Sequence, residues 1–206
     1  MKRLKKKERR EQIIERATEV FRQHGLKGAR TREIAKACGI NEALLYKHFK
    51  SKEELFRVVL KNIHEDLARE WYQTADAAED GRSALLRFIA THKAYMESNP
   101  GICASLIHGM SAASGDDMTR DMVREWFHGH HNFIASLARR GIDDGSLPTD
   151  VDPEQIAWWV RGAGWVAILA TYLGISGDSL EHDGWDAYKS LVQYLTGDRD
   201  KAATED

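Results

Sequence analysis

Apolar residues recur along this chain at the three- and four-residue spacing of an amphipathic helix, without the alternation typical of strands. In the first such stretch Ile13, Ala17 and Phe21 share one face, and Gly25 follows them. The pattern predicts an all-α fold of nine helices. They are expected at residues 8–24, 32–38, 41–49, 52–73, 82–97, 102–110, 117–140, 153–173 and 184–196.

Two short helices are predicted about a turn apart between residues 31 and 49. Thr31 is a suitable N-cap, because its hydroxyl can accept a hydrogen bond from an otherwise unpaired backbone N–H. Gly39 lies where a helix ends with positive φ, and Asn41 caps the next helix. This layout is that of a helix-turn-helix, whose second helix lies in the major groove of DNA.

Capping signals also mark the starts of two longer helices. In the segment from Ser51 to Glu54, the serine can accept from a backbone amide while the glutamate reaches back. Asp152, Pro153 and Gln155 combine a capping acid, a proline at the first helical position and a glutamine two residues on.

Charge is divided unevenly along the chain. Residues 1–52 carry 16 Lys/Arg against 6 Asp/Glu, a net charge of +10, and the remaining residues carry 14 against 26, a net charge of −12. Neutralising phosphates supplies much of a protein's affinity for DNA. We therefore expect a three-helix DNA-binding domain at residues 1–52 and an acidic second domain, at residues 53–206, that does not meet the polyanion.

Several features favour a cytoplasmic protein without a membrane partner. Cys38 lies within the helix-turn-helix and Cys103 in an apolar run, and both are expected to be reduced core residues. The N-terminus is charged and lacks the apolar stretch of a secretory signal. Residues 156–173 are strongly apolar, but Arg161 interrupts them, so a buried helix is favoured over a membrane span.

The stretch from residue 13 to residue 56 resembles the tetracycline-repressor family of bacterial one-component regulators. The resemblance rests on Phe21, Gly25, Thr31, Ile34, Ala35, Gly39, Leu45, Tyr46, Phe49, Lys52, Leu55 and Phe56. Beyond these residues only the helix layout is similar. The resemblance implies a homodimer that binds double-stranded operator DNA and releases it when the C-terminal domain binds a small molecule.

The resemblance also implies which residues contact DNA. Backbone phosphates are expected to meet Thr31, Tyr46, His48 and Lys52, which offer hydroxyl, phenol, imidazole and ammonium donors. The recognition helix would begin at Asn41.

Base readout is expected from Arg32, Glu42, Ala43, Leu44 and Lys47. Arg32 can pair with guanine, and Glu42 can accept from cytosine or simply be a favourable first-turn carboxylate. Leu44 stands where the family often has a small hydroxyl residue, which puts a hydrogen bond there in doubt. Leu45 and Phe49 are expected in the core.

The C-terminal part is rich in tryptophan and methionine, which suit adaptable apolar pockets between helices. Most of this material must be ordinary core. The ligand-contacting candidates are Met96, His108, Met110, Met122, Trp126, Trp158, Arg161, Trp165 and Tyr172. The polar members among them can equally have structural roles.

The last two predicted helices are too apolar to face water and are expected to pair with their copies as a two-fold four-helix bundle. The expected interface residues are Gly162, Gly164, Trp185, Tyr188, Leu191, Val192 and Leu195.

Two other classes of function stay open. His128, His130 and His131 form a cluster in which the first and last share a helix face, but surface histidines are favoured, and no metal or cofactor is expected. A helical enzyme would need inward carboxylates, and only Glu125 with His128 has suitable spacing, without a partner pair. A DNA-binding protein that responds to no ligand is the other alternative.

Overall fold

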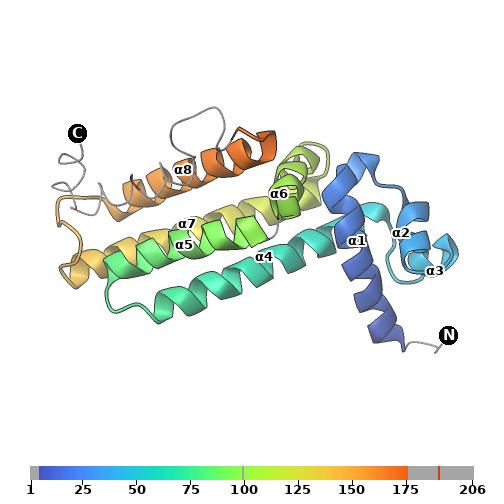
Figure 1. Ribbon diagram of the computed structural model, residues 1–206, viewed down its shortest axis with the longest axis horizontal. Helices are drawn as coiled ribbons and strands as arrows, with labels where there is room; N and C mark the ends of the chain where they lie inside the picture. Colours follow the sequence, from blue (N-terminus) through green and yellow to red (C-terminus); the bar gives the residue numbers. More distant parts are fainter. Residues whose placement is uncertain (1–4, 99, 176–189, 191–206) are drawn as a thin grey trace. The chain divides into compact units, whose positions relative to one another are not determined.

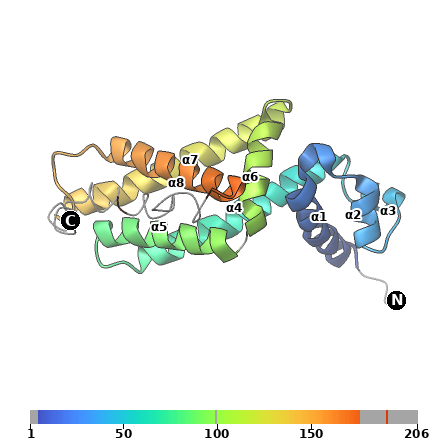
Figure 2. The same cartoon turned by 45° about the horizontal axis from the view of Figure 1, so that its top comes forward.

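The computed structural model of the protein describes residues 5–98, 100–175 and 190. Every regular element in these residues is an α-helix (Figures 1 and 2), which confirms the all-α prediction. The helices are α1 (Lys6–Gly28), α2 (Thr31–Ala37), α3 (Glu42–Tyr46), α4 (Lys52–Asp76), α5 (Gly81–Ser98), α6 (Pro100–Ala113), α7 (Asp117–Asp143) and α8 (Pro153–Leu173). The ninth predicted helix, at residues 184–196, lies outside the described residues.

The chain folds as two compact units. The first comprises Met1–Asp66 with Pro100–Val123, and the second comprises Leu67–Asn99 with Arg124–Asp206. The boundary between them therefore falls inside α4 and inside α7. The predicted division at residue 52 separates DNA binding from ligand binding and dimerisation rather than two compact units, and it stays a prediction.

The core of the first unit is built on aromatic rings from α1, α4 and the segment after α3. Phe21 meets Phe56 edge to face with ring centroids 4.9 Å apart, and both are buried. Leu45 and Phe49 are buried as predicted. The Arg10 guanidinium of α1 lies over the Phe49 ring, 4.7 Å from its centre, so α1 covers the ring that follows the recognition helix.

The local signals around the helix-turn-helix act largely as predicted. Gly39 has φ +65°, and the Asn41 side chain accepts from the backbone N–H three residues later at 2.8 Å. The Ser51 hydroxyl accepts from the Glu54 N–H at 3.1 Å. The Glu54 carboxylate accepts from the N–H of Lys50 at 2.6 Å, one residue earlier than the predicted capping box requires.

Two boundary predictions in this region were wrong. Helix α2 begins at Thr31 itself, and its N-cap is Arg30, which makes no side-chain capping bond. Thr31 is therefore already inside the helix, and its hydroxyl donates to a carboxylate on α3. The recognition helix α3 ends at Tyr46, because Lys47 is already its C-cap, rather than extending to residue 49.

Gly25 breaks α1 near its end. Its backbone angles, φ +62° and ψ −177°, lie outside the helical region. Residues other than glycine rarely adopt such a positive φ. A Cβ atom on Gly25 would also lie 2.9 Å from the imidazole of His108 on α6. Glycine is therefore required both by the backbone and by the close approach of α6.

The core of the second unit contains an aromatic cluster joining α4, α5 and α7, which run alongside one another in Figures 1 and 2. Trp71 of α4 stacks on His130 of α7 with ring centroids 4.3 Å apart. Phe88 and His92 of α5 each meet the Trp71 ring at 5.3 Å. His92 is buried, and desolvation lowers the pKa of its imidazole to about 4.

At one corner of this unit, the start of α5 touches the end of α7 backbone to backbone. A Cβ on Gly81 would lie 2.0 Å from the backbone nitrogen of Gly141, and a Cβ on Gly141 would lie 2.6 Å from the Leu147 side chain. The Gly81 N–H donates to the Asp144 carboxylate at 2.8 Å, which anchors the first turn of α5. This contact has no room for any side chain at either glycine.

Helix α8 has the predicted start, because the Asp152 side chain accepts from the Glu154 N–H at 2.9 Å and Pro153 is the first helical residue. Its large exposed apolar side chains are Trp158, Trp159, Val166, Leu169, Tyr172 and Leu173. In length and composition α8 could cross a membrane, a criterion that buried helices of globular proteins also meet.

Candidate nucleic-acid interface and ligand-contacting residues

An open cleft of about 630 Å³ is bordered by the end of α1, α2, α3 and the start of α4. Five of the predicted DNA-contacting residues line it together: Thr31, Arg32, Glu42, Tyr46 and Lys52. The other lining residues are Lys27, Ala29, Arg30, Lys50, Ser51 and Glu53. The fold therefore gathers residues from four helical segments onto one surface.

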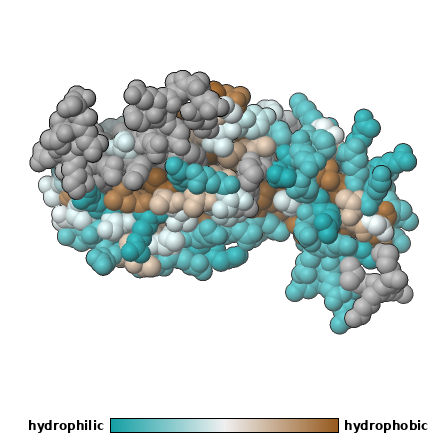
Figure 3. Space-filling model, in the orientation of Figure 1, coloured by the Kyte–Doolittle hydropathy of each residue, from teal (hydrophilic) through white to brown (hydrophobic). Residues whose placement is uncertain are grey.

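The cleft is cationic. Five lysine and arginine side chains line it against the two carboxylates of Glu42 and Glu53. The Lys52 ammonium donates to the Ala29 carbonyl at 3.0 Å, which holds its charge beside α2. Figure 3 shows that the surface of α1 to α3 is mostly hydrophilic. A concave cationic surface that includes a helix N-terminus suits backbone phosphates.

A hydrogen bond joins α2 to α3 inside the cleft. The Thr31 hydroxyl donates to the Glu42 carboxylate at 2.6 Å, and both groups are solvent-exposed. A hydroxyl has a single hydrogen to donate. Thr31 can therefore donate to a phosphate oxygen only after it releases Glu42.

A second depression of about 520 Å³ lies beside the cleft and shares Arg32 and Glu42 with it. Asn41 lines this depression only. Ala43 and Lys47 are exposed and Leu44 is half-buried, and these three line neither depression. Their predicted base contacts would arise on the outer surface of α3.

His48 is half-buried just after α3. Burial lowers the pKa of its imidazole, and the charges of Lys6, Arg10 and Arg9 lower it further. A neutral imidazole still has one N–H to donate but adds no charge. Its predicted phosphate contact stays a prediction.

Three basic residues of the cleft were missed in the sequence, namely Lys27, Arg30 and Lys50. All three belong to the basic module of residues 1–52, which was the available signal. Their place in the cleft depends on how α1, α2 and α4 pack, which the local pattern does not encode.

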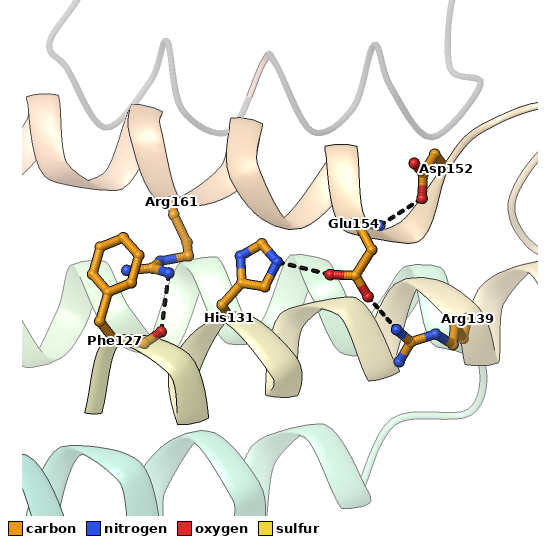
Figure 4. A network of polar contacts seen from close by, with 6 residues as sticks. All are labelled: Phe127, His131, Arg139, Asp152, Glu154 and Arg161. Atoms are coloured by element: carbon orange, nitrogen blue, oxygen red, sulfur yellow. Dashed lines mark hydrogen bonds and ion pairs between the residues drawn. The ribbon is translucent and has the colours of Figure 1, made fainter. Parts of the chain in front are cut away.

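In the second unit, α7 and α8 are joined by two sets of polar contacts (Figure 4). Glu154 of α8 bonds to the His131 Nε2 of α7 at 2.8 Å, and the same carboxylate accepts from Arg139. Two turns further along α8, Arg161 donates from Nη1 to the Phe127 carbonyl at 3.0 Å. Its guanidinium carbon lies 3.1 Å from the centre of the Phe127 ring.

The predicted ligand-contacting residues are distributed over both units. His108, Met110 and Met122 lie in the first unit, and Met96, Trp126, Trp158, Arg161, Trp165 and Tyr172 lie in the second. Met96 and Arg161 are buried, whereas Met110, Trp158 and Tyr172 are exposed. The structure brings Arg161 and Trp158 together, with 5.8 Å between the guanidinium carbon and the ring centre.

The three clustered histidines of α7 have separate surroundings. His128 is exposed, His130 stacks on Trp71, and His131 bonds to Glu154. Within residues 5–98, 100–175 and 190, no three His, Cys, Asp or Glu side chains are grouped so that they could hold a metal ion. Cys38 and Cys103 are buried free thiols, and burial raises the pKa of both.

Two of the predicted dimer-interface residues lie within the described part of α8. Gly162 is exposed and a Cβ added there would meet open space, and Gly164 is buried. The other five, Trp185, Tyr188, Leu191, Val192 and Leu195, lie outside the described residues. All seven stay predictions.

Comparison with known proteins gives matches over both parts of the chain. Residues 13–59 match the model of the family described as "Bacterial regulatory proteins, tetR family". Residues 81–182 match the model described as "Tetracyclin repressor-like, C-terminal domain".

Two curated relatives and one solved structure illustrate the similarity. The HTH-type transcriptional repressor KstR2 of Rhodococcus jostii is 28% identical over 171 residues, 78% of each chain. The nucleoid occlusion factor SlmA of Vibrio cholerae is 28% identical over 149 residues, 71% of this chain and 76% of its own. The FadR regulator of Bacillus subtilis in complex with stearoyl-CoA has the same fold, with a TM-score of 0.75, 17% identity and coverage of 91% and 97%.

Proposed function

The chain belongs to the tetR family of bacterial regulatory proteins, which are DNA-binding transcriptional regulators and not enzymes, and we propose that it is a ligand-released repressor. In this proposal a homodimer binds a palindromic operator in the cytoplasm and is released by a small, largely apolar effector. The observation that carries the proposal is the cationic cleft of α2, α3 and α4, in which five of the DNA-contacting candidates meet.

Within this proposal, residues 1–52 read DNA and residues 53–206 bind the ligand and the second protomer. Lys52 and Tyr46 hold phosphates from the cleft, while Arg32 and Glu42 reach base edges from the surface that the cleft shares with its neighbouring depression. Two-fold symmetry of the dimer would match a pseudo-palindromic operator.

Dimerisation is supported by the exposed apolar face of α8, because large exposed apolar surfaces mark interfaces. The face includes Trp159, Val166 and Leu173, which recur at helical spacing. We propose that α8 pairs with its copy along this face. The predicted ninth helix would complete a four-helix bundle.

Ligand release requires that the effector bind the DNA-free conformation more tightly, since only differential affinity shifts an equilibrium. Helix α4 starts in the cleft at Lys52 and continues without a break to Asp76. A change in its tilt would alter the spacing of the two recognition helices in a dimer. The coupling expected for such a device is about 1–3 kcal/mol.

The test begins with a genomic footprint, which would give the operator, followed by binding of the purified protein to that duplex at several salt concentrations. Lys52→Ala should weaken binding to all sequences and flatten the salt dependence, because one phosphate contact is lost. Arg32→Ala should instead relax preference at one base pair, by about 1–3 kcal/mol. Lys61→Ala, on the same helix but outside the cleft, is the matched control.

An affinity for duplex DNA that does not change with salt would contradict the proposal. So would a loss for Lys61→Ala equal to that for Lys52→Ala, because the cleft would then have no special role.

A second candidate function is a DNA-binding protein that responds to no small ligand, and one similar protein is described as a nucleoid occlusion factor rather than as a transcriptional repressor. The two candidates differ in whether effector binding and operator binding affect each other. A ligand-released repressor binds its effector more weakly when saturated with operator, by the factor by which the effector weakens operator binding. Equal effector affinity with and without operator would favour the second candidate.

A further inference from the structure

Arg161 carries a charge into the interior of the second unit. Only 4% of its surface is exposed, and its guanidinium lies against the Phe127 ring (Figure 4). Its one hydrogen bond within the described residues goes from Nη1 to the Phe127 carbonyl. A carbonyl and an aromatic face stabilise a cation, but neither supplies a countercharge.

No carboxylate within the described residues forms an ion pair with Arg161, and its Nε finds no acceptor there. Glu154 lies two turns earlier on α8, but its oxygens are engaged by His131 and Arg139 (Figure 4). Desolvation lowers the pKa of the Arg161 guanidinium to about 10, as expected for a buried cation without a countercharge.

Burying a charge without a partner costs more free energy than burying an apolar side chain of similar size. Packing alone therefore does not explain an arginine at this position. Nη1 donates the hydrogen bond to the carbonyl. The other edge of the guanidinium, formed by Nε and Nη2, donates no hydrogen bond to an acceptor in the described residues. Two parallel N–H groups on one edge match the two oxygens of a carboxylate.

Two aromatic rings, those of Phe127 and Trp158, lie near the guanidinium. The Trp158 ring lies 5.8 Å from the guanidinium carbon and 5.8 Å from the Phe127 ring. Trp158 is itself 57% exposed, so an aromatic ring in contact with solvent adjoins the buried cation. Such surroundings suit the apolar body of a ligand that carries one anionic group.

We propose that the Nε–Nη2 edge of Arg161 binds the carboxylate of an amphiphilic ligand whose apolar part lies against Phe127 and Trp158. The inference rests on the proposed function, because it assigns the charge of the effector. It narrows the largely apolar effector to an organic acid.

The test uses the full chain without DNA and a matched pair of probes, octanoate and octanamide, which differ in charge but hardly in shape. Isothermal titration calorimetry should show octanoate binding at least about 10-fold more tightly than octanamide, the factor that about 1.4 kcal/mol represents. Arg161→Met should abolish this difference. Arg161→Lys, which keeps the charge but loses the two-pronged edge, should reduce it.

Arg139→Met is the matched control, since it removes a neighbouring arginine that already has a carboxylate partner, and it should keep the full difference. Arg161→Met should also melt at the same temperature as the wild type or higher, because it removes an uncompensated buried charge. A lower melting temperature would overturn the inference by showing that the arginine is structural.

Equal affinities of the wild type for octanoate and octanamide, or an undiminished difference in Arg161→Met, would also overturn the inference. Since no DNA is present, these outcomes are independent of operator binding. A failure of the repressor proposal would appear in the salt-dependent DNA titration instead.

Discussion

Positive charge is exposed in the cleft of α2–α4 but buried in the contact of α7 with α8. In the cleft, five lysine and arginine side chains stand at an open surface, where water solvates them and a polyanion can replace that water. Between α7 and α8, a single arginine is buried with no carboxylate partner among the described residues. The exposed charges of the cleft lower the folding stability little, because water solvates them in the absence of DNA. The buried charge of Arg161 lowers the folding stability whether or not DNA is present.

The same contrast holds for apolar groups. The first unit buries the apolar side of its recognition helix at Leu45 and Phe49. The second unit leaves Trp159, Val166 and Leu173 exposed on α8. The cleft proposed to bind DNA is thus complete within one chain, while the apolar α8 surface is of the kind that marks an interface.

The largest expected effect comes from placing a charge on that apolar surface. Val166→Asp should leave the protomer folded, because Val166 is 64% exposed, but should weaken self-association by at least about 100-fold. Sedimentation velocity would measure this, with far-UV circular dichroism to check folding. Met118→Asp, which changes an equally exposed side chain in the first unit, should have no effect on self-association. A dimer of unchanged affinity in Val166→Asp would mean that α8 is not covered by its copy.

A smaller effect concerns acid, which should destabilise the second unit through His92. Its pKa is about 4 in the folded protein, against about 6.5 in an unfolded chain, so the unfolded state binds the proton first. Stability from neutral His92 is complete above pH 6.5 and falls by up to about 3 kcal/mol as the pH drops to 4.

Urea unfolding between pH 7 and pH 4 would measure this loss, and His92→Phe should lack most of it. His128→Gln, which changes an exposed histidine of the same unit, should retain the full loss. If His92→Phe shows the same pH dependence as the wild type, the acid sensitivity lies elsewhere.

The smallest effect concerns the bond between Thr31 and Glu42. Glu42→Gln should strengthen binding to random duplex DNA by about 1 kcal/mol, because it removes a carboxylate from the cleft and weakens the acceptor that holds Thr31. In a Thr31→Val background the gain should be smaller, which a double-mutant cycle would reveal. Fluorescence anisotropy with a random-sequence duplex is the measurement. Weaker non-specific binding in Glu42→Gln would show that this carboxylate does not compete with phosphate.

The local features of the fold were predictable because adjacent residues determine them. Gly39, Asn41, Ser51 and Asp152 act within a few residues of their own position, and the structure has each as the sequence indicated. Thr31 shows the limit of such reasoning. Its hydroxyl was expected to cap α2, but Thr31 is already the first helical residue, and its hydroxyl donates to a carboxylate eleven residues later. A local pattern does not reveal a partner so far along the chain.

The candidate site shows the same division. The basic module pointed to the DNA-binding end, and the motif singled out five residues of the cleft. Lys27, Arg30 and Lys50 complete the cleft only because three helices converge on it. The surroundings of Arg161 likewise depend on the packing of α7 against α8, and the sequence offered only an arginine within an apolar run.

The backbone contact between Gly81 and Gly141 constrains how this sequence can change during evolution. A Cβ at position 81 would lie 2.0 Å from a backbone nitrogen, and backbone cannot be exchanged for something smaller. No second mutation nearby can therefore make a substitution acceptable, unlike a clash between two side chains. Relatives that keep this corner should have glycine at position 81, whereas a side chain at position 141 would meet the Leu147 side chain and could be accompanied by a smaller residue at position 147.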